Sequence, residues 1–141
     1  MEPDAIVDRV DGVLHEKTQV TDRGVDLSLA TVETVREPGR VDFGGGELAT
    51  ATLSPVETAL RNPDDEYEWW NLDGGQYLIS YNETVTAGPP LVCEPRPALR
   101  ERGAFHPTTV VPPLGRVPLA VPDGGIRLKE NARVSTLRQL G

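Results

Sequence analysis

The chain has 141 residues, of which 22 are acidic and 14 are basic, and its formal net charge is −8. This length predicts one domain over residues 1–141, and the negative charge argues against a broad nucleic-acid-binding surface, which needs positive potential. Cys93 is the single cysteine, which excludes an internal disulfide or a thiolate zinc site within one chain. An acidic, lysine-poor composition is also typical of proteins from salt-rich cytoplasm.

Residues 1–20 are predicted to form a helical segment. Ile6, Val10, Val13 and Leu14 recur at helical spacing, which predicts one amphipathic helix, although Gly12 weakens it by about 1 kcal/mol. The acidic N-terminus is followed by no long apolar run. We therefore expect neither a signal peptide nor a membrane span, and a cytoplasmic location.

From Gly24 onwards the pattern changes to the alternation of a half-buried strand, which continues to Val35. Residues 37–46 are rich in glycine and residues 54–74 are polar and acidic, so both are predicted to be exposed loops. Trp69 and Trp70, near the end of the second loop, are expected to cover the core or a subunit contact. Short strands separated by turn residues predict an all-β fold; the further strands are expected at 47–53, 75–81, 83–86, 91–94, 117–121, 126–129 and 132–140.

Arginines are concentrated after the strand predicted at 91–94, within a helical turn that Gly103 is expected to end. The planar guanidinium fits phosphate oxygens, and each charge-assisted hydrogen bond contributes about 1.5 to 3 kcal/mol when shielded from water. Alternatively, Glu94 and Glu101 pair with these arginines on the surface, for about 0 to 1 kcal/mol. Both interpretations stay open for the three side chains, which are Arg96, Arg100 and Arg102.

Four short pieces of the chain resemble, in order and spacing, the motifs of the dCTP deaminase and dUTPase superfamily. Residues 24–27, GVDL, resemble the motif G-[VY]-D-L, and residues 96–108 resemble R-S-S-L-x-R-x-G-L-x-V-H-x-T. Residues 75–85 are similar to the hairpin that carries a P-G turn, and residues 132–140 to the closing strand A-R-I-x-Q-L. The resemblance implies a distorted β-barrel or β-clip with a short N-terminal helix. It also implies a homotrimer that binds nucleotides between its subunits.

Members of this superfamily remove pyrophosphate from dUTP or deaminate dCTP, and the dUTPase branch uses Mg²⁺. The resemblance therefore implies a deoxyribonucleoside triphosphate as the ligand. Arg96 matches the arginine that contacts phosphate, Gly103 matches the frame of the motif, and Asp26 matches the aspartate that helps to hold the metal. Arg100 and Arg102 are further candidates for the nucleotide, and His106 is a candidate general base because its unperturbed pKa suits that role.

The chain also departs from the motifs that it resembles. Pro97 and Ala98 replace two serines, and Glu101 replaces an arginine. Residues 105–122 contain no Asp or Glu, although the catalytic carboxylate of the superfamily falls in this interval. Loss of a general base typically lowers the rate about 10² to 10⁴-fold. Three interpretations follow: an active enzyme, a nucleotide-binding or nucleotide-sensing protein without catalysis, and a structural trimer without a ligand.

Overall fold

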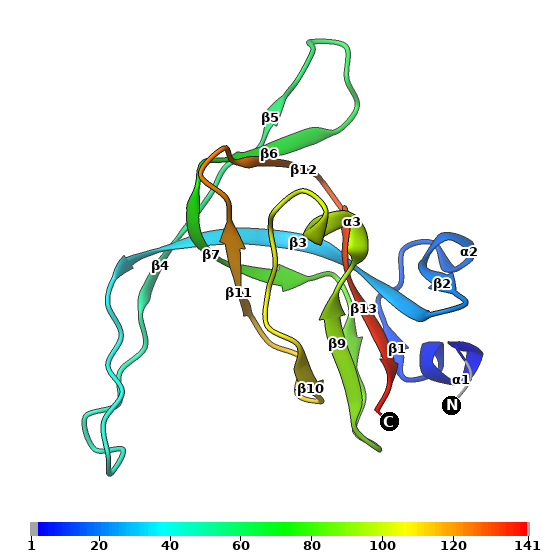
Figure 1. Ribbon diagram of the computed structural model, residues 1–141, viewed down its shortest axis with the longest axis horizontal. Coiled ribbons are helices and arrows are strands. Elements are labelled where there is room, and N and C mark those ends of the chain that lie inside the picture. Colours follow the sequence, from blue (N-terminus) through cyan, green and yellow to red (C-terminus); the bar gives the residue numbers. More distant parts are fainter. Residues whose placement is uncertain (1–2, 141) are drawn as a thin grey trace.

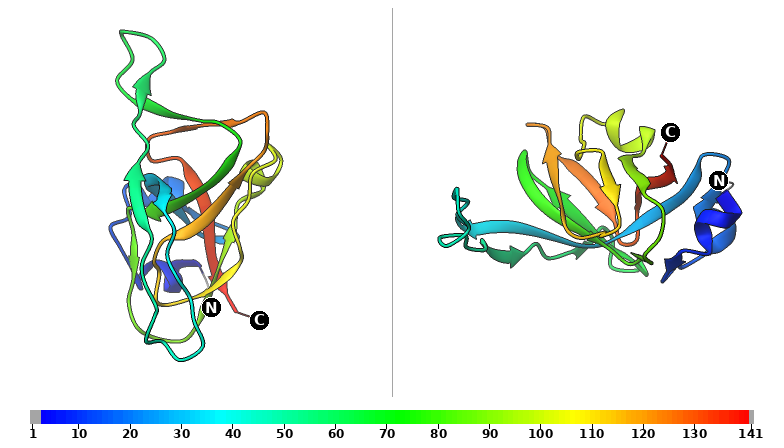
Figure 2. Two further views of the ribbon diagram at one scale, coloured as in Figure 1. Left: turned by 90° about the vertical axis from the view of Figure 1, so that its left-hand side faces the viewer. Right: turned by 90° about the horizontal axis from the view of Figure 1, so that it is seen from below.

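The computed structural model describes residues 3–140 as a curled antiparallel sheet with short helices at its edges (Figure 1; Figure 2). Within these residues no helix is long and apolar enough to cross a membrane. The elements in chain order are α1 (Pro3–Val7), β1 (Val10–Asp11), α2 (Glu16–Gln19), β2 (Val20–Thr21), β3 (Gly24–Glu37), β4 (Thr52–Pro55), β5 (Ala59–Leu60), β6 (Glu68–Leu72), β7 (Gly75–Tyr81), β8 (Thr84–Val85), β9 (Leu91–Pro95), α3 (Pro97–Arg100), β10 (Thr109–Val111), β11 (Val117–Val121), β12 (Ile126–Lys129) and β13 (Arg133–Gln139).

The long strand β3 lies at the centre of the main sheet, whose order is β10-β9-β13-β3-β7-β11. All of these pairings are antiparallel, and β2 and β4 also pair with β3. The register shifts within β3 and at the start of β13, and such bulges bend a strand and increase its twist. The sheet therefore curls into an open half-barrel (Figure 2). The predicted all-β, barrel-like fold is confirmed.

Two hydrophobic clusters form the core, and β3 contributes to both. Leu29 and Val32 pack with Trp70 and with residues of β7 and β11, beneath the small sheet β12-β6-β5. Val25 and Leu27 pack on the other side with residues of α1, β9 and β13. Burial of apolar surface contributes about 25 cal/mol per Å². Because one strand supplies both clusters, the two halves of the barrel are held together.

Most of the predicted strands form where turn residues delimit them. β7, β11 and β12 have the predicted bounds, and the strand that begins at Gly24 runs to Glu37. The strand predicted at 47–53 is displaced to Thr52–Pro55. The residues before it continue an exposed hairpin, which is joined by an isolated bridge between Arg40 and Ala49.

The single N-terminal helix predicted from the apolar spacing is wrong. Helix α1 ends at Val7, and Val10 pairs instead with Val85 of β8. Gly12 has φ +90°, and a Cβ atom there would lie 2.7 Å from the carbonyl oxygen of Asn82. The close approach of this backbone requires a glycine at position 12. Ile6 and Val10 are buried as the spacing predicted, but they lie in different elements.

The predicted loop over residues 54–74 is also wrong in its second half. Residues 68–72 form β6, which pairs with β12 and β5. Trp70 and Leu72 point into the core, whereas Trp69 and Asn71 alternate to the outer face. The preceding segment is polar and acidic, which is why the sequence predicted a loop rather than this strand. Residues 38–46, in the other predicted loop, are mostly exposed.

Candidate functional site

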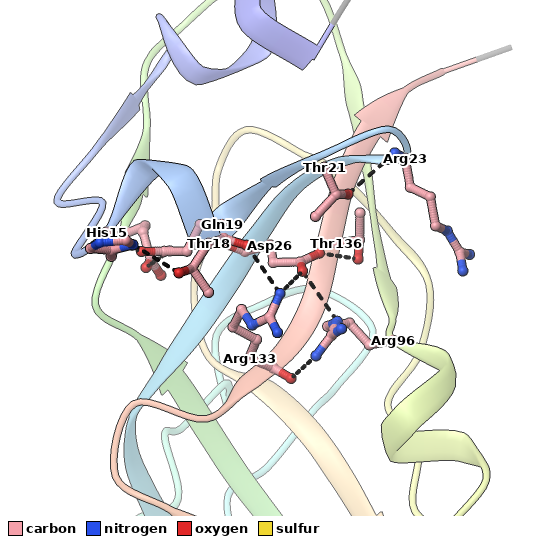
Figure 3. Close-up of polar contacts among 10 residues, drawn as sticks. His15, Thr18, Gln19, Thr21, Arg23, Asp26, Arg96, Arg133 and Thr136 are labelled. Atoms are coloured by element: carbon pink, nitrogen blue, oxygen red, sulfur yellow. Dashed lines mark hydrogen bonds and ion pairs between the residues drawn. The ribbon is translucent and has the colours of Figure 1, made fainter.

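A buried carboxylate on β3 binds two arginines (Figure 3). The side chain of Asp26 is 3% exposed, and its Oδ2 lies 3.2 Å from Nε of Arg96 and 3.0 Å from Nη1 of Arg133. Its Oδ1 accepts a hydrogen bond of 2.7 Å from the hydroxyl of Thr136. Nη1 of Arg133 also donates to the carbonyl oxygen of Thr18 at the end of α2. One negative charge thus faces two positive charges, which leaves this cluster with a surplus charge of +1.

Strand pairing brings these residues together from distant parts of the chain. β13 lies between β3 and β9, and Thr136 is directly opposite Asp26 on one side and Glu94 on the other. Arg96 follows the last residue of β9, so its side chain can reach across β13. It is the extended residue that precedes α3, with Pro97 at the first helical position. The backbone therefore places Arg96 beside Asp26 at the edge of a short helix.

A second set of buried polar groups supports the other side of Asp26. Nε2 of Gln19 donates to the backbone carbonyl oxygen of Asp26 at 2.9 Å and to Glu83 at 2.7 Å. The carboxylate of Glu83 also accepts from the backbone N–H and the hydroxyl of Ser28. The side-chain oxygen of Gln19 accepts from two backbone N–H groups that precede α2. The N-terminal segment is thereby attached to the strand that carries the site.

The structure does not bring the three predicted arginines together. Arg96 contacts Asp26, whereas Arg100 is exposed at the end of α3 and Arg102 lines a separate cavity. Arg96 is the extended residue before α3, Arg100 is the last residue of α3 and Arg102 lies beyond its end, so their side chains leave the backbone in different directions. Gly103 follows this turn with φ +87°, as expected for a residue that ends a helix.

The surface-pairing alternative holds for Glu101, which pairs with Arg102, but not for Glu94. Glu94 accepts a hydrogen bond of 2.9 Å from Arg138 on the adjacent strand. Glu101 lies 3.7 Å from Arg102, and both side chains are mostly exposed, so this pair contributes about 0 to 1 kcal/mol. Arg96 pairs instead with Asp26, which it shares with Arg133. Sequence reasoning missed Arg133 and Thr136, although their place in the closing motif was a usable signal.

A cavity of about 310 Å³ lies beside Asp26. Arg96 reaches it with a side chain that is 23% exposed. Arg23 also lines the cavity, but its side chain extends away from Asp26 (Figure 3). The cavity combines cationic and acidic groups with the start of α3, and its full lining is Thr21, Asp22, Arg23, Asp26, Arg96, Pro97, Ala98 and Thr136.

The predicted general base, His106, is buried and hydrogen-bonded through both ring nitrogens. It is 2% exposed; Nδ1 lies 2.8 Å from the carbonyl oxygen of Pro107, and Nε2 lies 2.7 Å from the hydroxyl of Ser135. Because a carbonyl only accepts, Nδ1 carries the proton and Nε2 accepts from Ser135. Ser135 in turn bonds Tyr81, whose hydroxyl lies 3.9 Å from the thiol of Cys93. Burial lowers the pKa of His106 and raises that of Cys93 to about 11, which keeps both groups neutral.

The lowered pKa of His106 predicts a loss of stability in weak acid. The unfolded chain takes up a proton near the ordinary histidine pKa of 6.5, whereas the folded imidazole resists it. The contribution of His106 to the free energy of unfolding is therefore fully present above pH 6.5. It decreases as the pH falls, by up to about 1.4 kcal/mol per pH unit, until the lowered pKa is reached. Urea unfolding of His106→Gln between pH 7.5 and 5.5 should show a flatter dependence than the wild type. His15→Gln, at an exposed position, is the control, and an unchanged slope in His106→Gln would contradict the prediction.

The residues around Asp26 do not fit a magnesium ion held by the protein. Mg²⁺ requires oxygen ligands in near-octahedral geometry. Both oxygens of Asp26 already bind Arg96, Arg133 and Thr136, and a cation there would face two guanidinium groups. Among residues 3–140 no group of three or more His, Cys, Asp or Glu side chains could hold a metal ion. Asp26 binds arginines in this structure, and its expected role in holding Mg²⁺ through water stays a prediction.

The fold is similar to that of a solved 2'-deoxycytidine 5'-triphosphate deaminase from Agrobacterium tumefaciens. The TM-score is 0.62 at 14% sequence identity, over 98% of this chain and 47% of that chain. This likeness shows that the chain has the same β-rich fold as that deaminase. No protein-family model matches the sequence.

Sequence relatives give the more specific assignment. The chain is 30% identical over 128 residues to a probable deoxyuridine 5'-triphosphate nucleotidohydrolase of Methanosarcina acetivorans, covering 86% of this chain and 71% of that protein. It is 32% identical over 103 residues to a protein of the same name from Methanococcoides burtonii, covering 72% and 57%. The chain therefore belongs to the dCTP deaminase and dUTPase superfamily. It spans about half to three-quarters of the length of the proteins that it matches.

Proposed function

We propose that this protein binds a deoxyribonucleoside triphosphate beside Arg96 without converting it, as a nucleotide-sensing member of the superfamily. In this proposal it is a cytoplasmic homotrimer, and a second subunit completes the site. The observation that carries the proposal is the contrast between two residues. Arg96 is partly exposed at a cavity, whereas His106 is buried with both ring nitrogens hydrogen-bonded.

Charge and geometry at Arg96 support phosphate binding. Arg96 uses Nε for Asp26 and Nη1 for the carbonyl oxygen of Arg133, and within residues 3–140 its Nη2 has no hydrogen-bond partner. The surplus positive charge of the cluster is available to an anion. A charge-assisted hydrogen bond from a guanidinium to phosphate contributes about 1.5 to 3 kcal/mol. Asp26 also holds the guanidinium in one orientation, which lowers the entropic cost of binding.

Neither candidate base in the part of the chain that the structure describes, Asp26 or His106, is free to remove a proton, which supports binding without turnover. A general base must lie about 2.6 to 3.2 Å from the proton that it removes, or act through one water. Residues 105–122 contain no Asp or Glu. Asp26 is bound to two arginines, and His106 is directed at Pro107 and Ser135. In this proposal any Mg²⁺ enters with the triphosphate rather than through Asp26.

Calorimetric titration with dUTP and with dCTP, each with Mg²⁺, tests the proposal. We expect saturable binding and, after prolonged incubation, neither pyrophosphate nor a deaminated product. Arg96→Ala should weaken binding about 10- to 100-fold, because it removes a charge-assisted contact of about 1.5 to 3 kcal/mol. Arg100→Ala, at the exposed end of α3, should bind as the wild type does.

Each other outcome selects a different function. Product that disappears in Arg96→Ala would establish an enzyme with an unforeseen base. No heat change with either nucleotide, for a protein that circular dichroism shows to be folded, would indicate a structural trimer in which Asp26 merely neutralises the arginines. A native melting temperature for Arg96→Ala is required before weaker binding is interpreted as loss of a contact.

A further inference from the structure

The hairpin between β3 and β4 exposes large apolar side chains at its tip. Val41 is 91% exposed, Leu48 is 64% exposed and Phe43 is fully exposed. In Figure 1 the hairpin extends away from the barrel, in cyan, and in the left view of Figure 2 it is the lowest part of the molecule. Clustered exposed apolar side chains mark interaction sites on soluble proteins. The hairpin therefore has the composition of a surface that binds a partner.

The tip is ordered and carries negative charge. The carboxylate of Asp42 accepts hydrogen bonds from the backbone N–H groups of Gly45 and Glu47, at 2.9 and 2.8 Å. A bridge between Arg40 and Ala49 closes the base of the tip. Among residues 37–49 there are three acids against one arginine, which gives a net charge of −2. An ordered, acidic and apolar projection is suited to a cationic pocket that contains an aromatic ring.

The outer face of the small sheet β12-β6-β5 provides such a pocket. A cavity of about 440 Å³ is lined there by Arg61, Trp69, Asn71 and Arg127. A second cavity of about 670 Å³ shares Asn71 and Arg127 with the first and also contains Arg102. The guanidinium of Arg61 lies 5.2 Å from the centre of the Trp69 ring. We refer to this surface as the cationic face.

The cationic face is unusual in a chain of net charge −8. Arg127 forms no ion pair within residues 3–140, Lys129 lies over the Tyr67 and Trp69 rings, and Arg61 lies 3.9 Å from Asp65. Asp73 lines the larger cavity, and the smaller cavity has no acidic side chain among its described lining residues. A cation without an ion pair, such as Arg127, is stabilised by an acidic partner.

We propose that the hairpin tip of one copy of this chain docks onto the cationic face of the next copy. Phe43 enters the cavity beside Trp69, and Glu47 lies opposite Arg127. Aromatic side chains that fill a pocket are typical anchors of protein interfaces. Charge complementarity favours a second copy as the partner, because the acidic tip and the cationic face belong to the same sequence.

The contact has to form between different copies. The hairpin and the small sheet lie at opposite ends of the molecule in Figure 1 and in the left view of Figure 2, so one chain cannot make the contact with itself. Two different surfaces in contact make a heterologous interface, which closes into a ring when the rotation between copies allows it and otherwise extends as an open filament. The inference rests on the homotrimer of the proposed function and names the surfaces that join it.

Photocrosslinking tests which surfaces meet. Benzoylphenylalanine replaces Phe43 in an equal mixture of ¹⁴N- and ¹⁵N-labelled full-length chains, which are irradiated without nucleotide. We expect mixed-isotope crosslinks from position 43 to peptides within residues 59–72 or 124–129. The same residue at position 110, on the exposed strand β10, should label other peptides. Crosslinks from position 43 that miss both ranges, or none at all, would overturn the proposal.

A charge reversal tests the predicted partner of Arg127. Arg127→Glu should weaken self-association about tenfold or more in sedimentation experiments, and adding Glu47→Arg should restore most of it. Equal affinities for the wild type and Arg127→Glu would contradict the assigned pairing. The crosslink is scored without nucleotide, so its failure leaves the Arg96 proposal standing. A failed nucleotide titration likewise leaves the crosslinks valid.

Discussion

Asp26→Asn is expected to lower the free energy of unfolding by about 3 kcal/mol. Removal of one partner from a buried ion pair typically costs about 3 to 5 kcal/mol, because the remaining charges stay buried and uncompensated. Here Arg96 and Arg133 would lose their common anion, and the asparagine amide would present a donor to a site filled with donors. The two arginine side chains are 23% and 32% exposed, which places the effect at the lower end of that range. Urea unfolding at pH 7 and constant salt measures it.

Asp22→Asn is the matched control for this substitution. Asp22 lines the same cavity but is exposed, so the same chemical change should alter stability by no more than about 0.5 kcal/mol. If the free energy of unfolding of Asp26→Asn were within about 1 kcal/mol of the wild-type value, Asp26, Arg96 and Arg133 would not be the ion-paired centre described above. Binding of dUTP or dCTP to a folded Asp26→Asn protein should also weaken, because Arg96 loses the group that orients it.

Gly24→Ala is expected to have the largest effect on the fold. Gly24 begins β3 with φ +148°, a conformation that side-chain-bearing residues rarely adopt. A Cβ atom there would overlap the backbone carbonyl oxygen of Leu137 on β13. The two strands would have to separate where Asp26 pairs with Thr136. We expect a loss of more than about 4 kcal/mol, visible as little folded protein by circular dichroism.

Gly44→Ala is the control for this glycine. Gly44 lies in the exposed hairpin, and no heavy atom would lie within 4 Å of an added Cβ. Its substitution should change stability by no more than about 1 kcal/mol in either direction. If the free energy of unfolding of Gly24→Ala equalled that of the wild type, the contact between β3 and β13 would be able to shift and accept a side chain.

Local patterns in the sequence were enough to predict the sheet. Strands β7, β11 and β12 formed as expected because each is an alternating run delimited by glycine, proline or asparagine, which act over a few residues. The same local logic failed where a distant strand intervened. Val10 left the predicted helix to pair with Val85, and β6 formed in an acidic segment because Trp70 and Leu72 fill the core beneath β12.

The candidate site was predicted in part. Arg96 and Asp26 were identified from motifs, but their contact and the participation of Arg133 required the pairing of β3, β13 and β9. Arg102 was grouped with Arg96 because they are close in sequence, although the turn at α3 directs it to another cavity.

The sequence by itself determined the β-rich fold class, the superfamily motifs and the lack of an acid in residues 105–122. The tertiary structure decided which charges meet, that His106 is buried against Ser135, and that the hairpin tip and the cationic face lie at opposite ends. The physical reason is the distance along the chain over which each interaction acts. Backbone propensity and alternation act between neighbouring residues, whereas ion pairing and burial depend on strand register between residues separated by up to about a hundred positions in the chain.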